Sequence, residues 1–545
     1  MKKKNRRYLP VIGSALVATG LTFSVQLVLA DTVNAKYPEN PVKDQNVFTR
    51  MFPNLESFAP KTDEARTVAK NIGVPGGLMD AKDNLTDPIQ SITNPAIFSP
   101  NNFDNPNMTA GVTFFGQFLD HDITLDKKSE LNAFAKPQST VNYRSTWFDL
   151  DSIYGSGPAG SSALYETSNG RIKFKVRVLP GAELVSRRGA IRYDLPRAED
   201  GTAIVAESRN DENIVISQFH TAMLKFHNAV TDYLAEKPEY ARFSADQLFD
   251  EARKTVTWHY QWIILNEYLP LIIGQNTVNS ILTKGPQFYT LTKQDDYIVM
   301  DDGTKLPRLP IEFSVAAFRF GHSQVRPSYR VNFGPTGGSP FFAFIFNDKL
   351  STNDPDPADM RGGRPAARRF IDWQTFFNFG DGNSRSNKLI DIKLSSPLML
   401  LPGATGPVPG LPDDGLQSLA SRNLVRHVNF GIPSGQSIAK VMKTTPLTTN
   451  DLSELTSYTA GGVTMAASTP LWYYILKEAQ IQQGGKRLGV VGGNIVGEVF
   501  ISLLKKDPKS YLTLNPQWAP SLPSATPGSF KITDLLNFAG VVPPL

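Results

Sequence analysis

The 545-residue chain contains no cysteine. It can therefore form no disulfide, no thiolate metal site and no iron–sulfur cluster. Histidine is scarce too, with six residues, and none of them form the His-Glu-x-x-His motif of zinc peptidases. An exported protein without disulfides depends for its stability on a large core and on any ion or cofactor that it binds.

Acidic residues are absent from the first 30 positions, which hold five basic residues. An apolar stretch from Tyr8 to Ala30 follows the basic residues and ends before Asp31, which is the layout of a secretory signal. We therefore expect a signal peptide at residues 1–30, or to Ala35, and a secreted, periplasmic or extracellular protein. The alternative is an uncleaved anchor, because the stretch is long enough to span a bilayer.

The same five basic residues account for the whole formal net charge of +5. A mature chain without net charge indicates no polyanionic partner, so we expect no nucleic-acid binding. No later apolar run reaches the length of a membrane span, so no membrane association is expected after signal cleavage.

The rest of the chain predicts a mainly α-helical fold: an irregular N-terminal arm at 31–105, then one large helical domain at 106–545 with few short strands and long loops. Alternating residues predict short strands within 170–205, and 140–155 resembles a loop rich in oxygen ligands. Ser244 and Gln247 predict a capping box, and Pro270 is expected to end that helix. Apolar spacing predicts helices at 108–122, 214–234, 244–268, 311–325, 414–445 and 470–505, with shorter helical pieces at 369–379.

One run carries an imidazole, two carboxylates and an amide among apolar neighbours: Gly116-Gln117-Phe118-Leu119-Asp120-His121-Asp122. In a helix, Gln117 and His121 lie on one face with Asp120 beside them, and Asp122 points toward a different site. This set suits proton transfer next to a large apolar cofactor. A histidine flanked by aspartates is also common as a structural residue, so other parts of the chain must support the catalytic interpretation.

A second histidine lies at the end of a predicted helix, in Phe318-Arg319-Phe320-Gly321-His322. Gly321 would let a flat ring approach the backbone, so His322 could bind a metal. Arg319 could pair with an anionic group at the edge of a cofactor. A neutral imidazole ligand needs an acceptor for its other N–H, and Asn423 offers an amide oxygen. Taken alone, each could be an ordinary buried residue.

Arg209 and Glu212 lie three residues apart in a polar segment. A permanent cation opposite a catalytic histidine can stabilise negative charge during cleavage of an O–O bond. Glu212 by itself is more typical of an acid at the start of a surface helix. His220, His227 and His259 have the spacing of packed helix faces, and we expect them to be structural.

Five separated motifs resemble those of the animal-type haem peroxidases, in the peroxidase–cyclooxygenase superfamily. They occur in the family's order and at compatible spacing, and the similarity runs from about residue 40 to near the C-terminus. Any one motif is weak, but the ordered set is specific. The motifs are the run 116–122, Phe148-Asp149-Leu150-Asp151-Ser152-Ile153-Tyr154-Gly155, Arg209-Asn210-Asp211-Glu212 followed by His220, Phe318-Arg319-Phe320-Gly321-His322, and Arg422-Asn423-Leu424 followed by Gly431-Ile432-Pro433.

The resemblance implies a role for each matching residue. His121 would be the distal acid–base group, with Gln117 as its pocket amide and Arg209 as the distal cation. His322 would be the proximal ligand of the haem iron, oriented by Asn423.

Further residues match positions that hold the haem or an ion in the family. Asp120 and Glu212 match residues that can form ester bonds to haem methyl groups, and Arg319 and Arg426 match partners of the propionates. A calcium site, with the hard oxygen ligands that Ca²⁺ prefers, is implied at Asp122, Ser145, Trp147 through its carbonyl, Asp149 and Asp151.

Two positions depart from the patterns of known members. Asn213 stands where myeloperoxidase has a haem-linked methionine, so a sulfonium link is not expected. Arg319 stands three residues before the proximal histidine, where the oxygenases of the superfamily have a radical tyrosine. This favours peroxidase chemistry.

The sequence therefore predicts an exported haem peroxidase that uses H2O2, through a ferryl intermediate, to oxidise small donors such as halides, thiocyanate or phenols. The alternatives are a fatty-acid dioxygenase on the same fold and a non-enzymatic extracellular adhesion protein.

Overall fold

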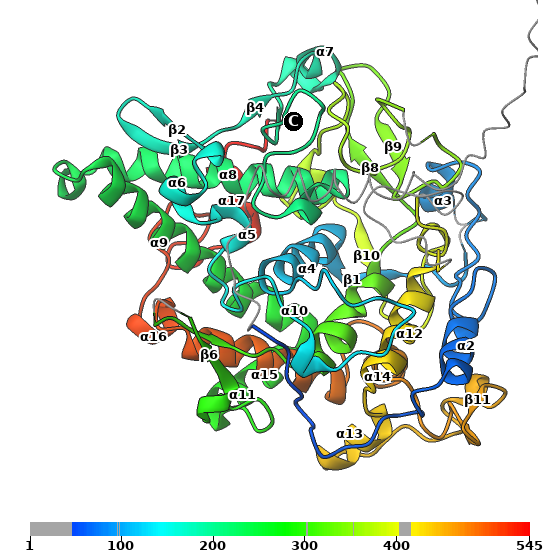
Figure 1. Ribbon diagram of the computed structural model, residues 1–545. Coiled ribbons are helices and arrows are strands. Elements are labelled where there is room, and N and C mark those ends of the chain that lie inside the picture. The colour runs from blue at the N-terminus through cyan, green and yellow to red at the C-terminus, as the bar shows by residue number, and fades with distance from the viewer. Residues whose placement is uncertain are drawn as a thin grey trace, which may run out of the picture. The chain divides into compact units, whose positions relative to one another are not determined.

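Helices are the main regular structure of the computed structural model, which describes residues 46–94, 96–97, 99–300, 303–351, 354–402 and 416–544 (Figure 1). The prediction of a mainly α fold is confirmed. The predicted signal peptide lies outside the described residues. The α-helices are α2 (Asp63–Ile72), α3 (Gln90–Thr93), α4 (Ala110–Ile123), α5 (Asp151–Tyr154), α6 (Gly157–Gly160), α7 (Ala182–Val185), α8 (Ile214–Ala235), α9 (Ala245–Ile263), α10 (Leu269–Ile273), α11 (Gln275–Lys284), α12 (Leu419–Phe430), α13 (Gly435–Val441), α14 (Leu471–Gln483), α15 (Val490–Lys506), α16 (Tyr511–Leu514) and α17 (Ile532–Phe538).

Strands in the described residues form only two-stranded antiparallel sheets. Asn169 and Gly170, both with positive φ, join β2 to β3 in the tight turn that suits a twisted hairpin. Short strands were predicted within 170–205, and β3, β4 and β5 lie there. The pairs are β1 (Asp104–Thr109) with β10 (Ser386–Lys388), β2 (Tyr165–Ser168) with β3 (Arg171–Phe174), β4 (Arg177–Val178) with β5 (Tyr193–Asp194), β6 (Tyr297–Val299) with β7 (Lys305–Pro307), β8 (Ser328–Asn332) with β9 (Phe341–Phe344), and β11 (Thr459–Ala460) with β12 (Val463–Thr464).

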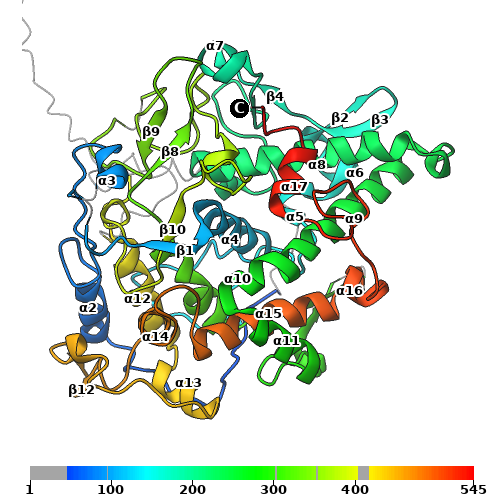
Figure 2. The ribbon, with the colours of Figure 1, turned by 180° about the vertical axis from the view of Figure 1, so that it is seen from behind.

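Helix α4 occupies a central position in both views of the ribbon (Figure 2). It packs against α8, β10 and the 3-10 helix η9 (Ala317–Gln324). Its bounds agree with the predicted helix at 108–122 to within two residues. Gly116 allows a close approach here, because a Cβ at this position would lie 2.5 Å from the hydroxyl of Tyr268. The central helix is thus fixed by packing on several sides.

The helix predicted at 244–268 begins as expected, since Ser244 and Gln247 form the capping box of α9. The expectation that Pro270 ends it is wrong. A π-helical turn, η6 (Ile264–Tyr268), follows α9 directly, and Pro270 lies in the first turn of α10. Proline donates no backbone hydrogen bond, yet the path stays helical here across the change from the π turn to α10. The helical path therefore continues to Gly274.

The helix predicted at 311–325 exists, but it is not an α-helix. It consists of a π-helical turn, η8 (Glu312–Ala316), followed by η9. A 3-10 helix has three residues per turn, so residues three apart lie directly above one another. Arg319 and His322 therefore share one face of η9.

Within the expected irregular arm, residues 46–94 contain two short helices, α2 and α3. Thr62 caps α2, whose buried face carries Ala65, Ala69 and Ile72, and this helix packs on α12. Apolar side chains of this segment join the same core cluster as those of α4, α8 and α15. In the described part of the chain, no helix is both long and apolar enough to cross a membrane.

Candidate active site

One strip of α4 remains accessible although the helix is otherwise buried. Gly116, Gln117 and Asp120 are partly exposed, whereas every other residue of α4 is buried. Burial raises the pKa of Asp120. We call this partly exposed strip of α4, together with the neighbouring Glu212, the recess. The predicted grouping of Gln117 with Asp120 on one face is thus observed.

His121 lies at the edge of this strip and is 5% exposed. Its Nδ1 is 2.8 Å from Oδ1 of Asn210, and its Nε2 is 3.9 Å from Oε1 of Glu212. An amide oxygen only accepts hydrogen bonds, so Nδ1 carries the proton and Nε2 has a free lone pair. Burial, together with the charge of Arg209, lowers the pKa of His121 to about 3. The ring is therefore a neutral base with its acceptor nitrogen on the side of Glu212.

Glu212 and Gln117 connect α4 to the segment that precedes α8. Gln117 Nε2 donates to Glu212, and Asn213 Nδ2 donates to Gln117 Oε1 over 3.3 Å. The Glu212 side chain is 44% exposed, yet burial raises its pKa to about 7, partly offset by Arg209. Partly exposed and bonded to Gln117, Glu212 thus belongs to the same recess. Asn213 also caps α8, which gives it a structural reason to be asparagine.

Arg209 is held by a fully buried counter-ion, Glu207. Its Nε and its backbone N–H each donate to Glu207 Oε1 over 2.9 Å, and Nη2 donates to Oε2 over 3.0 Å. Nη2 also donates to the carbonyl oxygens of His121 and Thr124 at the end of α4. Burial alone would raise the pKa of Glu207, but Arg209 and Arg144 outweigh it and hold it below the usual range. Glu207 therefore stays ionised and fixes the guanidinium beside α4.

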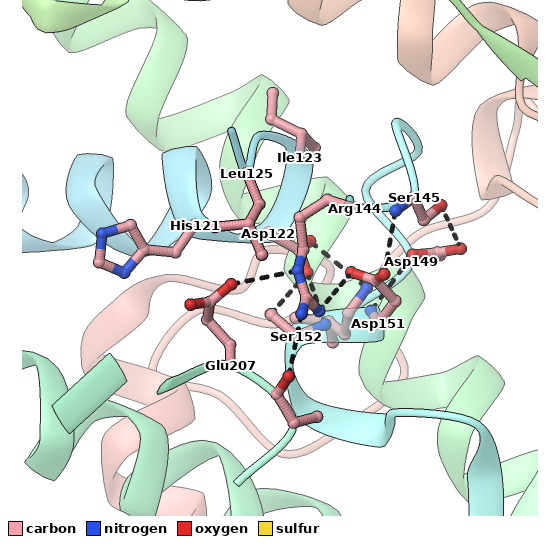
Figure 3. A network of polar contacts seen from close by, with 12 residues as sticks. His121, Asp122, Ile123, Leu125, Arg144, Ser145, Asp149, Asp151, Ser152 and Glu207 are labelled. Carbon is pink, nitrogen blue, oxygen red and sulfur yellow. Dashed lines mark hydrogen bonds and ion pairs between the residues drawn. The ribbon is translucent and has the colours of Figure 1, made fainter. Parts of the chain in front are cut away.

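Arg144 extends this ionic network away from His121 (Figure 3). Its Nε lies 3.1 Å from Glu207 Oε2, its Nη1 lies 3.4 Å from Asp151 Oδ1, and its side chain is fully buried. Figure 3 shows His121 and Asp122 extending from α4 in opposite directions, with Arg144 and the 145–152 loop on the side of Asp122. The expectation that Asp122 serves a different site agrees with this geometry.

The predicted oxygen-rich loop surrounds Asp122. Asp122 accepts hydrogen bonds from Ser152 Oγ over 2.7 Å and from the Tyr260 hydroxyl over 3.0 Å. Burial and repulsion from Asp151 and Asp149 raise the pKa of Asp122 well above its usual value. Across the described residues, no three His, Cys, Asp or Glu side chains stand close enough together to hold a metal ion. The loop thus concentrates buried negative charge, and its oxygens bond to neighbouring protein donors.

His322 lies in η9 beside Asn423 of α12. Asn423 Nδ2 is 2.8 Å from His322 Nδ1, and Asn423 Oδ1 accepts from Arg319 Nη1 over 3.0 Å. The expectation that Asn423 offers its oxygen to His322 is therefore wrong in this structure, because Arg319 occupies that oxygen. Burial and Arg319 lower the pKa of His322 to about 3, so its ring is neutral. A Cβ at Gly321 would meet no atom within 4 Å, so open space adjoins this turn.

Arg319 and Arg426 lie close enough to repel one another. Burial, followed by the charge of Arg426, lowers the pKa of Arg319 to about 10. Arg426 donates to Ser129 Oγ over 2.7 Å and lies 3.5 Å from Asp126. Asp120 attracts Arg319, and its carboxyl is also attracted by Arg209. Asp120 therefore lies within electrostatic reach of both the His121 side and the His322 side.

The remaining histidines have structural partners. His227 Nδ1 lies 3.0 Å from the Tyr154 hydroxyl, and His259 and His427 each contact the carbonyl oxygen four residues earlier. His220 is buried and contacts Asn210.

Sequence reasoning missed three residues of the site: Glu207, Asn210 and Arg144. Glu207 lies two residues before Arg209 and Asn210 directly follows it, and this closeness in the chain was the one signal available. Nothing local in the sequence shows that their side chains turn toward α4. The position of Arg144 depends on a loop that folds back over α4.

Comparisons with known proteins show what this chain resembles. Residues 126–350 match the family model for the animal haem peroxidase. Human thyroid peroxidase is 28% identical over 212 residues, which cover 36% of this chain and 21% of that protein. The match thus spans about a fifth of that relative.

Two solved structures share the fold. Peroxidase A from Dictyostelium discoideum superposes with a TM-score of 0.50 and 18% identity, over 87% of this chain and 91% of the other. The fatty acid alpha-dioxygenase of Oryza sativa, with palmitic acid, gives a TM-score of 0.51 and 13% identity, over 84% of this chain and 75% of the other. At these identities, the likeness shows the fold alone. The match of residues 126–350 to the family model and the similarity to thyroid peroxidase show that this part of the chain is similar to the animal haem peroxidases.

Proposed function

We propose that this protein is an exported haem peroxidase that reduces H2O2 and oxidises a small donor such as a halide, thiocyanate or a phenol. The observation that carries the proposal is the neutral His121 ring, whose unprotonated Nε2 faces Glu212 while Arg209 is held beside the same helix. A base and a fixed cation at one recess are what heterolytic cleavage of a peroxide requires.

The residues fit a haem. Gln117, Asp120 and Glu212 form the recess, open space adjoins Gly321, and the half-buried cation Arg319 would attract an anion. When bound, the haem supplies the electrons that break the O–O bond. We assign the iron ligand to His322 and the propionate partners to Arg319 and Arg426, as the family resemblance implies.

The Asn423 amide bears directly on this assignment. A His322 ring that binds iron through Nε2 must carry its proton on Nδ1, and Nδ1–H needs an acceptor. An Arg319 engaged by a propionate would release Asn423 Oδ1 for that purpose. Haem binding and the orientation of this amide are therefore linked in the proposal.

The proton path follows from the geometry of the chain. Nε2 of His121 would accept the proton of the peroxide oxygen nearer the cofactor. The ring would then return this proton to the other peroxide oxygen, which leaves as water. Arg209 stabilises the negative charge that develops meanwhile, and Glu207 keeps its guanidinium in place. Gln117 supplies the amide of the pocket.

Replacement of His121 by Ala tests this function. We expect the reaction of the haem-loaded protein with H2O2, followed by stopped-flow absorbance, to slow by a factor of about 10² to 10⁴. His259→Gln is a matched control, because it alters a buried histidine whose ring contacts Trp518 and Phe530 rather than the recess. An unchanged rate in the His121 variant would refute the proposal. Oxygen uptake with linoleate in the absence of peroxide would favour a dioxygenase, and failure to bind haem would favour an adhesion protein.

Covalent attachment of the haem through Asp120 and Glu212 is a further part of the proposal. Both carboxyls line the recess, and burial raises the pKa of each, which favours the uncharged form. Acid–acetone extraction after turnover, with mass measurement of the peptides, tests this. Haem that extracts freely contradicts it.

We also propose that Asp122, Ser145, Trp147, Asp149 and Asp151 bind calcium. The three carboxylates do not stand together as a metal-binding cluster in this structure, so a bound ion would have to draw them together. The carboxylates are buried, and burial and mutual repulsion raise the pKa of Asp122. A hard divalent cation would relieve that repulsion. We expect calcium to raise the melting temperature relative to EDTA, and Asp122→Asn to abolish the difference. Equal melting temperatures with and without calcium would exclude the site.

A further inference from the structure

A buried asparagine lies between two histidines at the recess. Asn210, in the 3-10 helix η4 (Ser208–Asp211), is fully buried. Its Oδ1 is 2.8 Å from Nδ1 of His121 in α4, and its Nδ2 is 3.0 Å from Nδ1 of His220 in α8. His121 and His220 are 5% and 1% exposed, so water does not compete for these contacts. One amide thus bridges two rings from two different helices.

The chemistry of an amide assigns a tautomer to each ring. Oδ1 only accepts, so His121 carries its proton on Nδ1 and leaves the lone pair on Nε2. Nδ2 only donates, so His220 has its lone pair on Nδ1 and its proton on Nε2. Burial lowers the pKa of His220 to about 3, so this ring stays neutral and keeps an acceptor nitrogen. The two histidines therefore have opposite tautomers.

We propose that Asn210 is a positioning residue that selects the Nδ1–H tautomer of His121, and that His220 fixes the orientation of the Asn210 amide. This inference rests on the proposed function, in which Nε2 of His121 accepts a proton from peroxide. A His121 ring with its proton on Nε2 would have no lone pair facing Glu212 and could not act as that base. His220 acts indirectly. Its Nδ1 accepts a hydrogen bond, so the Asn210 amide must turn Nδ2 toward it and Oδ1 toward His121.

The tautomers can be read in the full-length chain without haem, after labelling of its histidines with ¹⁵N. Wild-type protein should show His121 protonated at Nδ1 and His220 protonated at Nε2. The His121→Gln and His220→Gln variants assign the signals by their disappearance. Asn210→Leu, which has similar volume but no polar atom, should leave His121 as a mixture of tautomers. A wild-type His121 protonated at Nε2, or a tautomer unchanged in Asn210→Leu, would overturn the inference.

Asn210→Asp is the conservative variant. Whether or not its carboxyl is ionised, an oxygen remains to accept from His121 Nδ1, so the Nδ1–H tautomer should persist. This variant also covers the case in which Asn210→Leu does not fold, because it makes its own prediction for His220. An ionised carboxyl cannot donate, so His220 should then shift its proton to Nδ1. Loss of the Nδ1–H tautomer of His121 in Asn210→Asp would contradict the proposed role.

The haem-loaded protein provides the second readout. Asn210→Leu should slow the reaction with H2O2 by about 10-fold to 100-fold, Asn210→Asp should restore most of the rate, and haem affinity should be equal in both. If His121→Ala is slow while Asn210→Leu reacts at the wild-type rate, this inference fails and the proposed function survives. If His121→Ala itself reacts at the wild-type rate, the proposed function fails, and the NMR result still decides the tautomer.

Discussion

The two histidine–asparagine pairs of the site differ in which end of the amide faces the ring. Asn210 turns its oxygen to His121, and Asn423 turns its nitrogen to His322. His121 is buried and His322 is partly exposed, but both have a pKa lowered to about 3. Amide orientation assigns them different lone pairs: the first ring has its lone pair on Nε2 and the second has it on Nδ1.

The arginines beside the two pairs explain the difference. Arg209 bonds to a buried carboxylate, Glu207, and leaves Asn210 free to bind His121. None of the hydrogen bonds that Arg319 makes within the described residues goes to a carboxylate; its partners are the Ser314 carbonyl and Asn423 Oδ1. On the His121 side, a carboxylate of the chain therefore neutralises the arginine. On the His322 side, the arginine hydrogen-bonds only to neutral groups among the residues that the structure describes. In the proposed function, that is the side that would supply the iron ligand and the partners of the propionates.

The largest effect that would test this comparison is expected from His322→Ala. Loss of a partner that merely orients a metal ligand costs about 10-fold to 100-fold in affinity, so loss of the ligand should cost at least that. The measurement is the Soret absorbance during titration with haem. His121→Ala, matched in residue type, should bind haem normally and lose only the peroxide reaction. Equal haem affinity in both variants would show that the two sides do not have the roles proposed.

Glu207→Gln should have the next largest effect, on stability. The substitution leaves Arg209 and Arg144 without their shared buried counter-ion, and breaking a buried ion pair costs about 3–5 kcal/mol. Denaturant unfolding of the haem-free chain measures it. Glu251→Gln, which removes a partially exposed ion pair with Lys254, is the control and should cost about 1 kcal/mol or less. A Glu207 variant as stable as this control would show that the His121 side is not held by its ionic network.

The sequence predicted the parts of this comparison that depend on local pattern. The apolar spacing located α4, and the capping residues located the start of α9. It could not predict the orientation of Asn423, because that depends on Arg319, which lies about 100 residues away in the chain. Nor could it predict the bridging role of Asn210, which requires α4 and α8 to meet at η4. The course of the helix through Pro270 was missed because a preceding π turn changes the hydrogen-bond register, and residue spacing does not reveal such a turn.

Alanine substitutions at Gly116 and Gly321 test the two sides through smaller expected effects. Alanine at Gly116 would place Cβ 2.5 Å from the Tyr268 hydroxyl, whereas alanine at Gly321 would meet nothing within 4 Å. Overpacking of this kind costs about 1–3 kcal/mol, so Gly116→Ala should lower the free energy of unfolding by that amount and Gly321→Ala should leave it nearly unchanged. In the proposed function, Gly321→Ala should instead weaken haem binding. Thermal unfolding and haem titration of both variants separate the two effects, and a Gly321 variant that loses stability without haem would contradict the open space at this turn.

The smallest effect concerns the carboxyl that His121 faces. Burial raises the pKa of Glu212 to about 7 in the folded chain, above the usual value of 4.5. The folded state then binds the proton more tightly than the unfolded state, so this group lowers stability as the pH rises from about 4.5 to 7. Its effect is small, because the side chain is 44% exposed and water screens the charge. Glu212→Gln cannot ionise and should remove this contribution. The melting temperature of the variant minus that of wild type should therefore increase between pH 5 and pH 7.5. A difference that does not change with pH would show that Glu212 is already ionised at pH 5, as an ordinary surface carboxylate would be.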